Sequence, residues 1–307
     1  MGQVLVLGLI SGGIYALFAL GVVLVFRGTG VLSFAQGEIG TASLFLAAFL
    51  VTDIGLPWFV GAAAALAFAV GIGVLFEFLV VRRMVGGDPV SVAVATVGLG
   101  LFLLSGEFYL FGESPKQLAA PFAGGFTLAG VRVTPTQVLA LVLALGLGFG
   151  LQAALRRTDF GLGILAAAQD PTAVRLVGVP LSRITLTVWG AGAALACIAS
   201  LLVVPTVGVF APGYASELYV VGLAAAVVGG LTSLPGAFVG GLTLGLTEAA
   251  ATRYLGDLGI PGLRYVVVLT VLLVALLGRQ YAPQLRALLS PPPQTPAPAR
   301  ETAGASA

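Results

Sequence analysis

Long uncharged stretches dominate the chain, and short segments between them carry most of the charge. Residues 1–26, 133–155, 184–216 and 218–247 contain no Asp, Glu, Lys or Arg. A helix needs about 20 apolar residues to cross the roughly 30 Å hydrocarbon core of a bilayer. Because every backbone N–H and C=O must be bonded internally in hydrocarbon, such stretches are expected to form a helical bundle. The pattern predicts an all-α polytopic membrane protein.

The hydrophobic pattern predicts a bundle of eight or nine transmembrane helices. The ambiguity comes from two short Gly-rich spans, 217–231 and 236–252, which could form two thin crossings or one broken, re-entrant pair. The expected spans are 3–26, 35–51, 57–81, 90–111, 134–155, 184–205, 217–231, 236–252 and 263–278. They would build one transmembrane domain over residues 1–280. A Pro/Ala-rich tail over 281–307 is expected to be disordered.

Basic residues divide unequally between the two ends of the predicted bundle. With nine crossings, one side collects Arg27, Arg82, Arg83, Arg156, Arg157, Arg175, Arg183, Arg279 and Arg286. The other side collects Lys116, Arg132, Arg253 and Arg264. The positive-inside rule places the first group in the cytoplasm. The N-terminus would then face outward, and the C-terminal tail would be cytoplasmic.

The composition excludes several classes of chemistry. The chain has no His, which removes His-based catalysis and His metal sites. Pro115 precedes the single Lys116 where a phosphate-binding P-loop needs Gly, so ATP hydrolysis by that route is excluded. The formal charge of +2 is too small to suggest nucleic-acid binding. We therefore expect no enzyme activity, no cofactor and no metal, and we expect the single Cys197 to be a buried apolar residue.

Pairs of glycines at GxxxG spacing occur inside the predicted spans. Such pairs let helices approach closely in lipid, and clustering with Pro or polar residues points instead to helix interruption near a transport path. The pairs are Gly8/Gly12, Gly146/Gly150, Gly236/Gly240 and Gly241/Gly245. Two sites meet the clustering condition: Gly12-Gly13 beside Ser11, and Gly229-Gly230 before Ser233-Leu234-Pro235-Gly236.

The longest expected cytoplasmic connection covers residues 156–183. Helix–helix connections usually take about two to eight residues, so one of 28 residues needs a structural reason. A short helical run ending at Gln169 follows Gly161, and Asp170 can cap a second helix that has Pro171 at its first position. Apolar residues in this segment indicate either a docking surface for another protein or a cap on the chain's own bundle.

Four separated motifs lie in the chain. The 156–183 connection contains Arg157-Thr158, Gly161, Ala166, Asp170-Pro171, Ala173, Leu176 and Gly178-Val179. The other three are GLISGGIYAL at 8–17, LSFAQGE at 32–38 and GGLTSLPGA at 229–237. In this order they resemble the motifs of permease subunits in branched-chain amino-acid ABC importers, the bacterial high-affinity leucine/isoleucine/valine permease family.

The resemblance implies a permease of the bacterial inner membrane that moves branched-chain or related small amino acids by alternating access. Its implied partners are a second permease subunit, two cytoplasmic ABC ATPases that hydrolyse the ATP, and an extracytoplasmic solute-binding protein. Gln36 stands where the family often has His, and Thr232 where it usually has Gly. The first departure leaves urea or short-amide transport within the same family as an alternative. A proton-coupled secondary transporter working through Glu38 or Glu248 is a second alternative.

The candidate functional residues form two groups. The expected substrate path is lined by Ser11, Gly12, Tyr15, Gln36, Gly37 and Glu38. The expected ATPase contact is made by Ala168, Gln169, Asp170, Pro171 and Ala173. The alternative role for Gln36 and Glu38 is stabilisation of a helix N-terminus. Ser33 and Gln36 would form a capping box, and Glu38 would lie near the helix start, where the helix dipole favours a carboxylate.

Other carboxylates near the predicted spans have expected environments of their own. Glu77 is expected to meet Arg82 because both long side chains can extend toward the same membrane–water interface. This pair would have a structural role. Glu107 and Glu217 are expected near the outer boundary, where water is accessible. Glu248 lies deeper and has no partner near it in the sequence.

Overall fold

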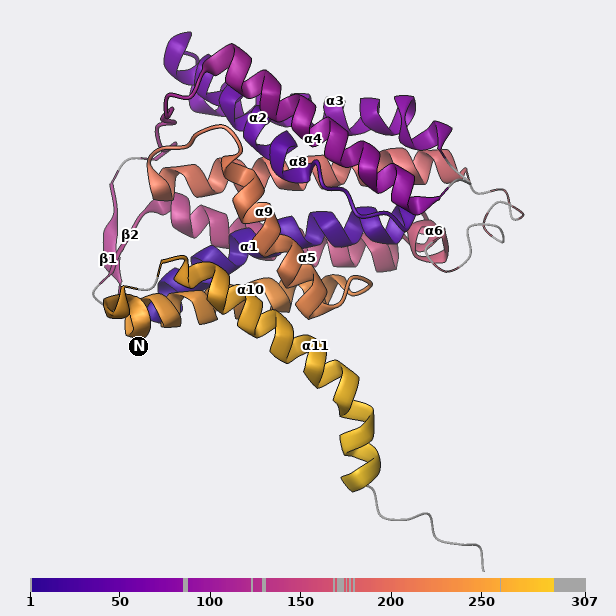
Figure 1. Ribbon diagram of the computed structural model, residues 1–307. Helices are drawn as coiled ribbons and strands as arrows, with labels where there is room; N and C mark the ends of the chain where they lie inside the picture. Colours follow the sequence, from indigo (N-terminus) through magenta and orange to yellow (C-terminus); the bar gives the residue numbers. More distant parts are fainter. Residues whose placement is uncertain are drawn as a thin grey trace, which may run out of the picture.

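The computed structural model describes residues 2–84, 88–122, 124–128, 131–167, 169, 174, 176, 178, 180–259 and 261–289. Its helices are α1 (Gly2–Thr29), α2 (Gln36–Ala48), α3 (Trp58–Leu79), α4 (Pro89–Phe111), α5 (Pro135–Arg157), α6 (Asp159–Ala167), α8 (Leu181–Val207), α9 (Tyr214–Gly229), α10 (Leu234–Leu255) and α11 (Leu263–Leu289) (Figure 1). Strands β1 (Phe126–Leu128) and β2 (Val131–Val133) form an antiparallel hairpin. One π-helical turn, Phe49–Asp53, continues α2, and 3₁₀ turns occupy Val81–Arg83 and Gly256–Leu258.

The described residues confirm the predicted all-α membrane class. Five helical segments are long and apolar enough to cross a bilayer: Val4–Thr29, Trp58–Arg83, Pro89–Phe111, Pro135–Arg157 and Leu181–Val204. Two shorter apolar segments are Tyr214–Gly229 and Leu263–Gly278. The count of eight or nine crossings therefore stays a prediction.

One arrangement of helices occurs twice in the chain. The long helices α1 and α8 each end at a glycine with positive φ, Gly30 at 72° and Gly208 at 89°. In each case a six-residue segment that begins with this glycine leads to a shorter helix (α2 or α9). Another long helix (α3 or α10) then follows. The helices α1 and α8 run in opposite directions along the bundle (Figure 1). Inverted repetition of this kind is common among transport proteins.

The helices α1 and α10 pack at unusually close range. A Cβ on Gly245 would overlap the backbone of Gly12, and a Cβ on Gly12 would lie 2.8 Å from Cα of Leu242. A Cβ on Gly241 would lie 2.5 Å from the backbone N of Ala16. Only glycine permits this approach, which confirms the packing role of Gly8/Gly12 and Gly241/Gly245.

The remaining GxxxG pairs differ from one another. Gly236 and Gly240 pack against Gly229 and Ala225 of α9, again with no room for a Cβ. By contrast, a Cβ added at Gly146 or at Gly150 would meet no described atom within 4 Å. The pair on α5 therefore faces away from the chain's own bundle, so it does not pack these helices together.

Two expected boundaries were wrong. The last helix, α11, continues to Leu289, past the expected start of the tail at residue 281, and its far end extends away from the other helices (Figure 1). The short helix α6 begins at Asp159, two residues before Gly161. A Cβ on Gly161 would overlap Leu155, so this glycine allows the tight turn between α5 and α6. The predicted second helix capped by Asp170 falls largely outside the described residues.

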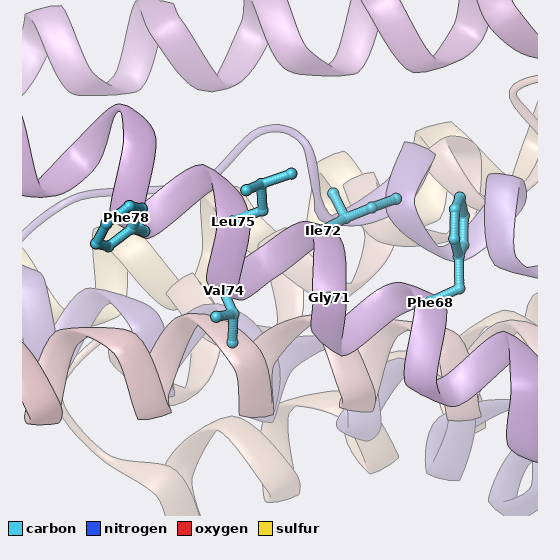
Figure 2. A pocket seen from close by; sticks show the side chains of 6 residues that line it. All are labelled: Phe68, Gly71, Ile72, Val74, Leu75 and Phe78. Carbon is cyan, nitrogen blue, oxygen red and sulfur yellow. The ribbon is translucent and has the colours of Figure 1, made fainter.

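An apolar groove on α3 shows what the lipid-facing surface is like. Figure 2 shows its lining side chains: Phe68, Gly71, Ile72, Val74, Leu75 and Phe78. All come from one helix, and none offers a polar group. The groove therefore has no polar group with which to recognise a polar solute.

Candidate functional site

The N-terminus of α9 lies inside the bundle and is satisfied by side chains from two other helices. Gly213, at a left-handed φ of 77°, precedes its first turn. Its N–H donates to Oε2 of Glu107 on α4 at 3.1 Å, and the N–H of Ala215 donates to Oγ1 of Thr41 on α2 at 3.0 Å. The first amides of a helix have no partner within the helix, and its dipole favours a carboxylate there. Side chains of α4 and α2 therefore accept the hydrogen bonds that the first amides of α9 cannot make within their own helix.

A second carboxylate joins this helix end from α2. Glu38 lies in the first turn of α2, as predicted, and its Oε1 accepts from Oγ of Ser216 at 2.7 Å. The approach is close because a Cβ on Gly37 would lie 2.6 Å from Cα of Ser216. The N-terminal turns of α2 and α9 therefore meet, with Glu38 and Glu107 both bound to the start of α9.

The two carboxylates keep spare hydrogen-bonding capacity. Glu38 is 8% exposed and Glu107 only 2%. Among the described residues, Oε2 of Glu38 and Oε1 of Glu107 have no hydrogen-bond partner. Ionisable groups at bilayer depth are costly unless paired, so they are functional candidates by default. The prediction that Glu107 is hydrated at a boundary was wrong, because helix α9 begins over it; Glu217 is exposed, as expected.

The expected capping box at Ser33 and Gln36 was also wrong. The helix α2 begins at Gln36, and its N-cap, Ala35, makes no side-chain cap bond. Nε2 of Gln36 instead donates to the carbonyl of Gly21 on α1 at 3.3 Å, and the carbonyl of Ser33 accepts from the hydroxyl of Tyr219. Partners on α1 and α9 thus replaced the local ones. We call Ser33, Gln36, Glu38, Thr41, Glu107, Ser216 and Tyr219 the α2–α9 cluster.

The other predicted path residues lie elsewhere, along the contact of α1 with α10. Tyr15 donates its hydroxyl proton to Oε2 of Glu248 at 2.6 Å and accepts from Nη2 of Arg264 at 2.7 Å. Nε of Arg264 lies 3.2 Å from Oε1 of Glu248, and its guanidinium lies 5.5 Å from the Tyr15 ring centroid. Glu248, without a neighbour in sequence, thus gains two partners and ties α1, α10 and α11 together. Gly12 packs nearby, and Ser11 is half-buried.

Glu77 occupies a third polar site, between α3 and α8. It is fully buried and accepts from Oγ1 of Thr185. The expected pair with Arg82 is not formed, and the Arg82 guanidinium lies instead 5.8 Å from the Phe78 ring centroid. The partner is therefore a hydroxyl on another helix, and the structural role stays a prediction.

The comparisons with known proteins agree with this architecture. Residues 4–276 match the family described as "Branched-chain amino acid transport system / permease component". The chain belongs to this permease family. It is therefore a multi-pass membrane protein and a transport subunit.

Two curated relatives show how far the likeness extends. The permease is 32% identical to the high-affinity branched-chain amino acid transport system permease protein BraD of Pseudomonas aeruginosa, over 83% of this chain and 87% of BraD. It is 27% identical to LivH of Escherichia coli K12, over 89% of this chain and 94% of LivH. A solved structure, PsaBC from Streptococcus pneumoniae in complex with Fab, aligns with a TM-score of 0.48 at 15% identity and covers 88% of this chain and 89% of its own.

The expected ATPase contact is only partly described. Ala168, Asp170, Pro171 and Ala173 lie outside the described residues, and Gln169 donates its N–H to the carbonyl of Ala166 at 3.0 Å.

The apolar side chains of the 156–183 connection differ in burial. Ile164 and Val174 are buried, as expected for a cap on the chain's own bundle, whereas Leu162 is 50% exposed and Leu176 is 84% exposed. The docking surface for another protein stays a prediction.

Sequence reasoning missed Thr41, Ser216 and Tyr219 as members of the α2–α9 cluster. Each meets a partner 174 to 186 positions away along the chain. The duplicated pattern of a long helix, a glycine and a short helix was the one available signal, since it places the starts of α2 and α9 at equivalent positions.

Proposed function

We propose that this chain is the membrane-spanning permease subunit of an ATP-driven ABC importer for branched-chain or related small amino acids. The observation that carries the proposal is the family match over residues 4–276, which includes both helix repeats. The relatives BraD and LivH are named as branched-chain amino acid permeases, and the chain matches them over most of their length. The location would be the bacterial inner membrane, with the N-terminus outside and the C-terminus inside, as the basic residues favour.

The proposed mechanism is alternating access around the α2–α9 cluster. Gln36, Gly37 and Glu38 would line the path, because this part of the interior combines buried carboxylate oxygens with two helix starts. Ser11, Gly12 and Tyr15 would lie beside it on α1, at the contact with α10. Movement of α9 relative to α2 would break the Ser216–Glu38 bond and free the carboxylate for a solute ammonium group.

The proposed partners are a second permease subunit, two cytoplasmic ABC ATPases and an extracytoplasmic solute-binding protein. The ATPase would contact residues 168–173 and the exposed side chains of α6. Because α6 packs against α1 and α8, and these helices pack against α9 and α2 in turn, a push on α6 would be transmitted to the cluster through α1 and α8.

Crosslinking tests the ATPase contact. Cys197 is the single cysteine and is buried, so an introduced cysteine can be labelled selectively. We expect Leu162→Cys, in the assembled complex, to crosslink to a nucleotide-binding subunit, with a yield that changes when ATP is bound. The matched control is Phe122→Cys, which is 43% exposed and packs against Phe59 in the first turn of α3, four residues before β1 in the chain. The strand β1 lies at the end of the bundle opposite α6 (Figure 1). Crosslinking of Phe122→Cys to that subunit, and none from Leu162→Cys, would contradict the proposal.

A charge-neutral substitution tests the path. Glu38→Gln keeps the shape of the side chain and an acceptor for Ser216, so the complex should assemble normally. We expect its leucine uptake to fall about tenfold, the effect of losing one charge-assisted interaction. Glu77→Gln is the control, since Glu77 is also buried and bonded to a hydroxyl but lies between α3 and α8. Unchanged uptake in Glu38→Gln, or an equal loss in both variants, would exclude a path role.

A further inference from the structure

A small cavity lies at the β-hairpin end of the bundle, which the proposed orientation places outside. It has a volume of 170 Å³ and lies between the end of α2, the π-helical turn and the segment that follows α4. Its lining residues are Phe45, Ala48, Phe49, Thr52, Asp53, Phe111, Pro115, Lys116 and Gln117. Drug-sized ligands occupy pockets of about 300–1,000 Å³, so this cavity suits something the size of one amino acid.

Two side chains of opposite charge line this cavity without pairing. Asp53 ends the π-helical turn, and Lys116 is the chain's only lysine. Among the described residues, neither takes part in an ion pair, although both face the same small space. An anion and a cation that line one cavity without pairing match the ammonium and carboxylate of a zwitterion. The π-helical turn adds to the argument, since such turns are frequent at functional sites.

Three phenylalanines also line the cavity, and one of them is firmly packed. The Phe45 ring stacks on Phe111 with centroids 4.8 Å apart, and it meets Phe210 edge-on at 4.9 Å. Phe45 is 1% exposed, whereas Phe49 is 41% exposed at the rim. An apolar side chain placed against Phe45, Phe49 and Phe111 would leave water, which favours leucine-like solutes over polar ones.

We propose that this cavity binds an apolar amino acid as a zwitterion, with Lys116 bound to its carboxylate, Asp53 to its ammonium group and the phenylalanines to its side chain. The proposal rests on the proposed transport function and adds to it a solute site separate from the α2–α9 cluster. The solute would occupy this site on the outer side before it reaches the buried carboxylates.

The backbone of Lys116 connects the cavity to the cluster. Its N–H donates to the carbonyl of Phe210 at 2.9 Å, and the N–H of Phe210 donates back at 3.0 Å. Three residues later, Gly213 starts the turn that binds Glu107. A solute held by Lys116 would therefore be linked, through the backbone bonds of Lys116 to Phe210, to the segment that leads into α9.

Binding selectivity tests the site. The full chain, in lipid nanodiscs, would be titrated with radiolabelled L-leucine and competed with 4-methylpentanoate, which lacks the ammonium group, and with 3-methylbutylamine, which lacks the carboxylate. For the unaltered chain we expect both analogues to bind about tenfold more weakly than leucine. In Lys116→Gln the advantage of leucine over the amine should disappear, and in Asp53→Asn its advantage over the acid should disappear. Glu113→Gln, on the same loop but outside the cavity lining, should match the unaltered chain.

Three results would overturn the proposal: no leucine binding by the unaltered chain, leucine binding of normal affinity in both variants, or equal loss of all three ligands in both. Uptake by the assembled transporter separates this failure from failure of the proposed function. If the unaltered complex imports leucine and Lys116→Gln leaves its half-saturating concentration unchanged, the cavity site is wrong and the transport function stands. If the unaltered complex imports no leucine, the transport function itself is wrong.

Discussion

Gly245→Ala should strongly destabilise the fold, although it adds a single methyl group. That methyl would overlap the backbone of Gly12, and the neighbouring Gly241 and Gly8 fit equally closely against the opposite helix. The backbones of α1 and α10 must therefore separate, which disturbs the most buried of the five candidate spans. Overpacking of a core costs about 1–3 kcal/mol, and we expect this backbone contact to lie at about 3 kcal/mol. The loss would be measured as thermal stability of the purified chain in detergent.

Gly146→Ala is the matched control for this prediction. It changes glycine to alanine in the middle of a long apolar helix, but the added methyl meets no described atom within 4 Å. Alanine favours a helix over glycine by about 0.5–1 kcal/mol, so this variant should be as stable as the parent or slightly more stable. Equal loss of stability in both variants would show that the α1–α10 contact is not the cause.

Arg264→Gln should be the most damaging single change among the described ion-pairing residues. It leaves Glu248 without its cation and Tyr15 without a donor, at a place where the carboxylate side chain is 18% exposed. Breaking a fully buried pair costs about 3–5 kcal/mol, and the 28% exposure of Arg264 reduces the expected loss to about 2–3 kcal/mol. The helix α11 should also loosen, because this contact holds its first turn against α1 and α10. Hydrogen exchange of residues 263–278 would report that loosening.

The double variant Glu248→Gln/Arg264→Gln separates charge from packing. Removing both charges leaves two polar side chains that can still bond to each other and to Tyr15, so most of the lost stability should return. If the double variant is no more stable than Arg264→Gln, the arginine acts through packing of its stem and its contact with the Tyr15 ring. The intramembrane ion pair would then contribute nothing of its own.

The errors in the sequence predictions share one physical cause. Ser33 and Gln36 have the spacing of a capping box, yet Gln36 bonds to Gly21 on another helix. Glu77 is near enough to Arg82 to suggest a local pair, yet it bonds to Thr185. In a bundle with little water, a polar side chain takes whichever partner the neighbouring helix presents, and local spacing does not report that partner.

The sequence by itself determined the membrane class, the permease family, the packing role of the Gly8/Gly12 and Gly241/Gly245 pairs, and the positions of the helices to within a few residues except at the end of α11. These follow from the chain because the need to bond every backbone group in hydrocarbon acts on each segment separately. The tertiary structure decided which polar groups meet. Ser216 reaches Glu38 from 178 positions away, and Arg264 reaches Tyr15 from 249. Such meetings depend on how the helices cross, and no periodicity within one helix encodes the crossing.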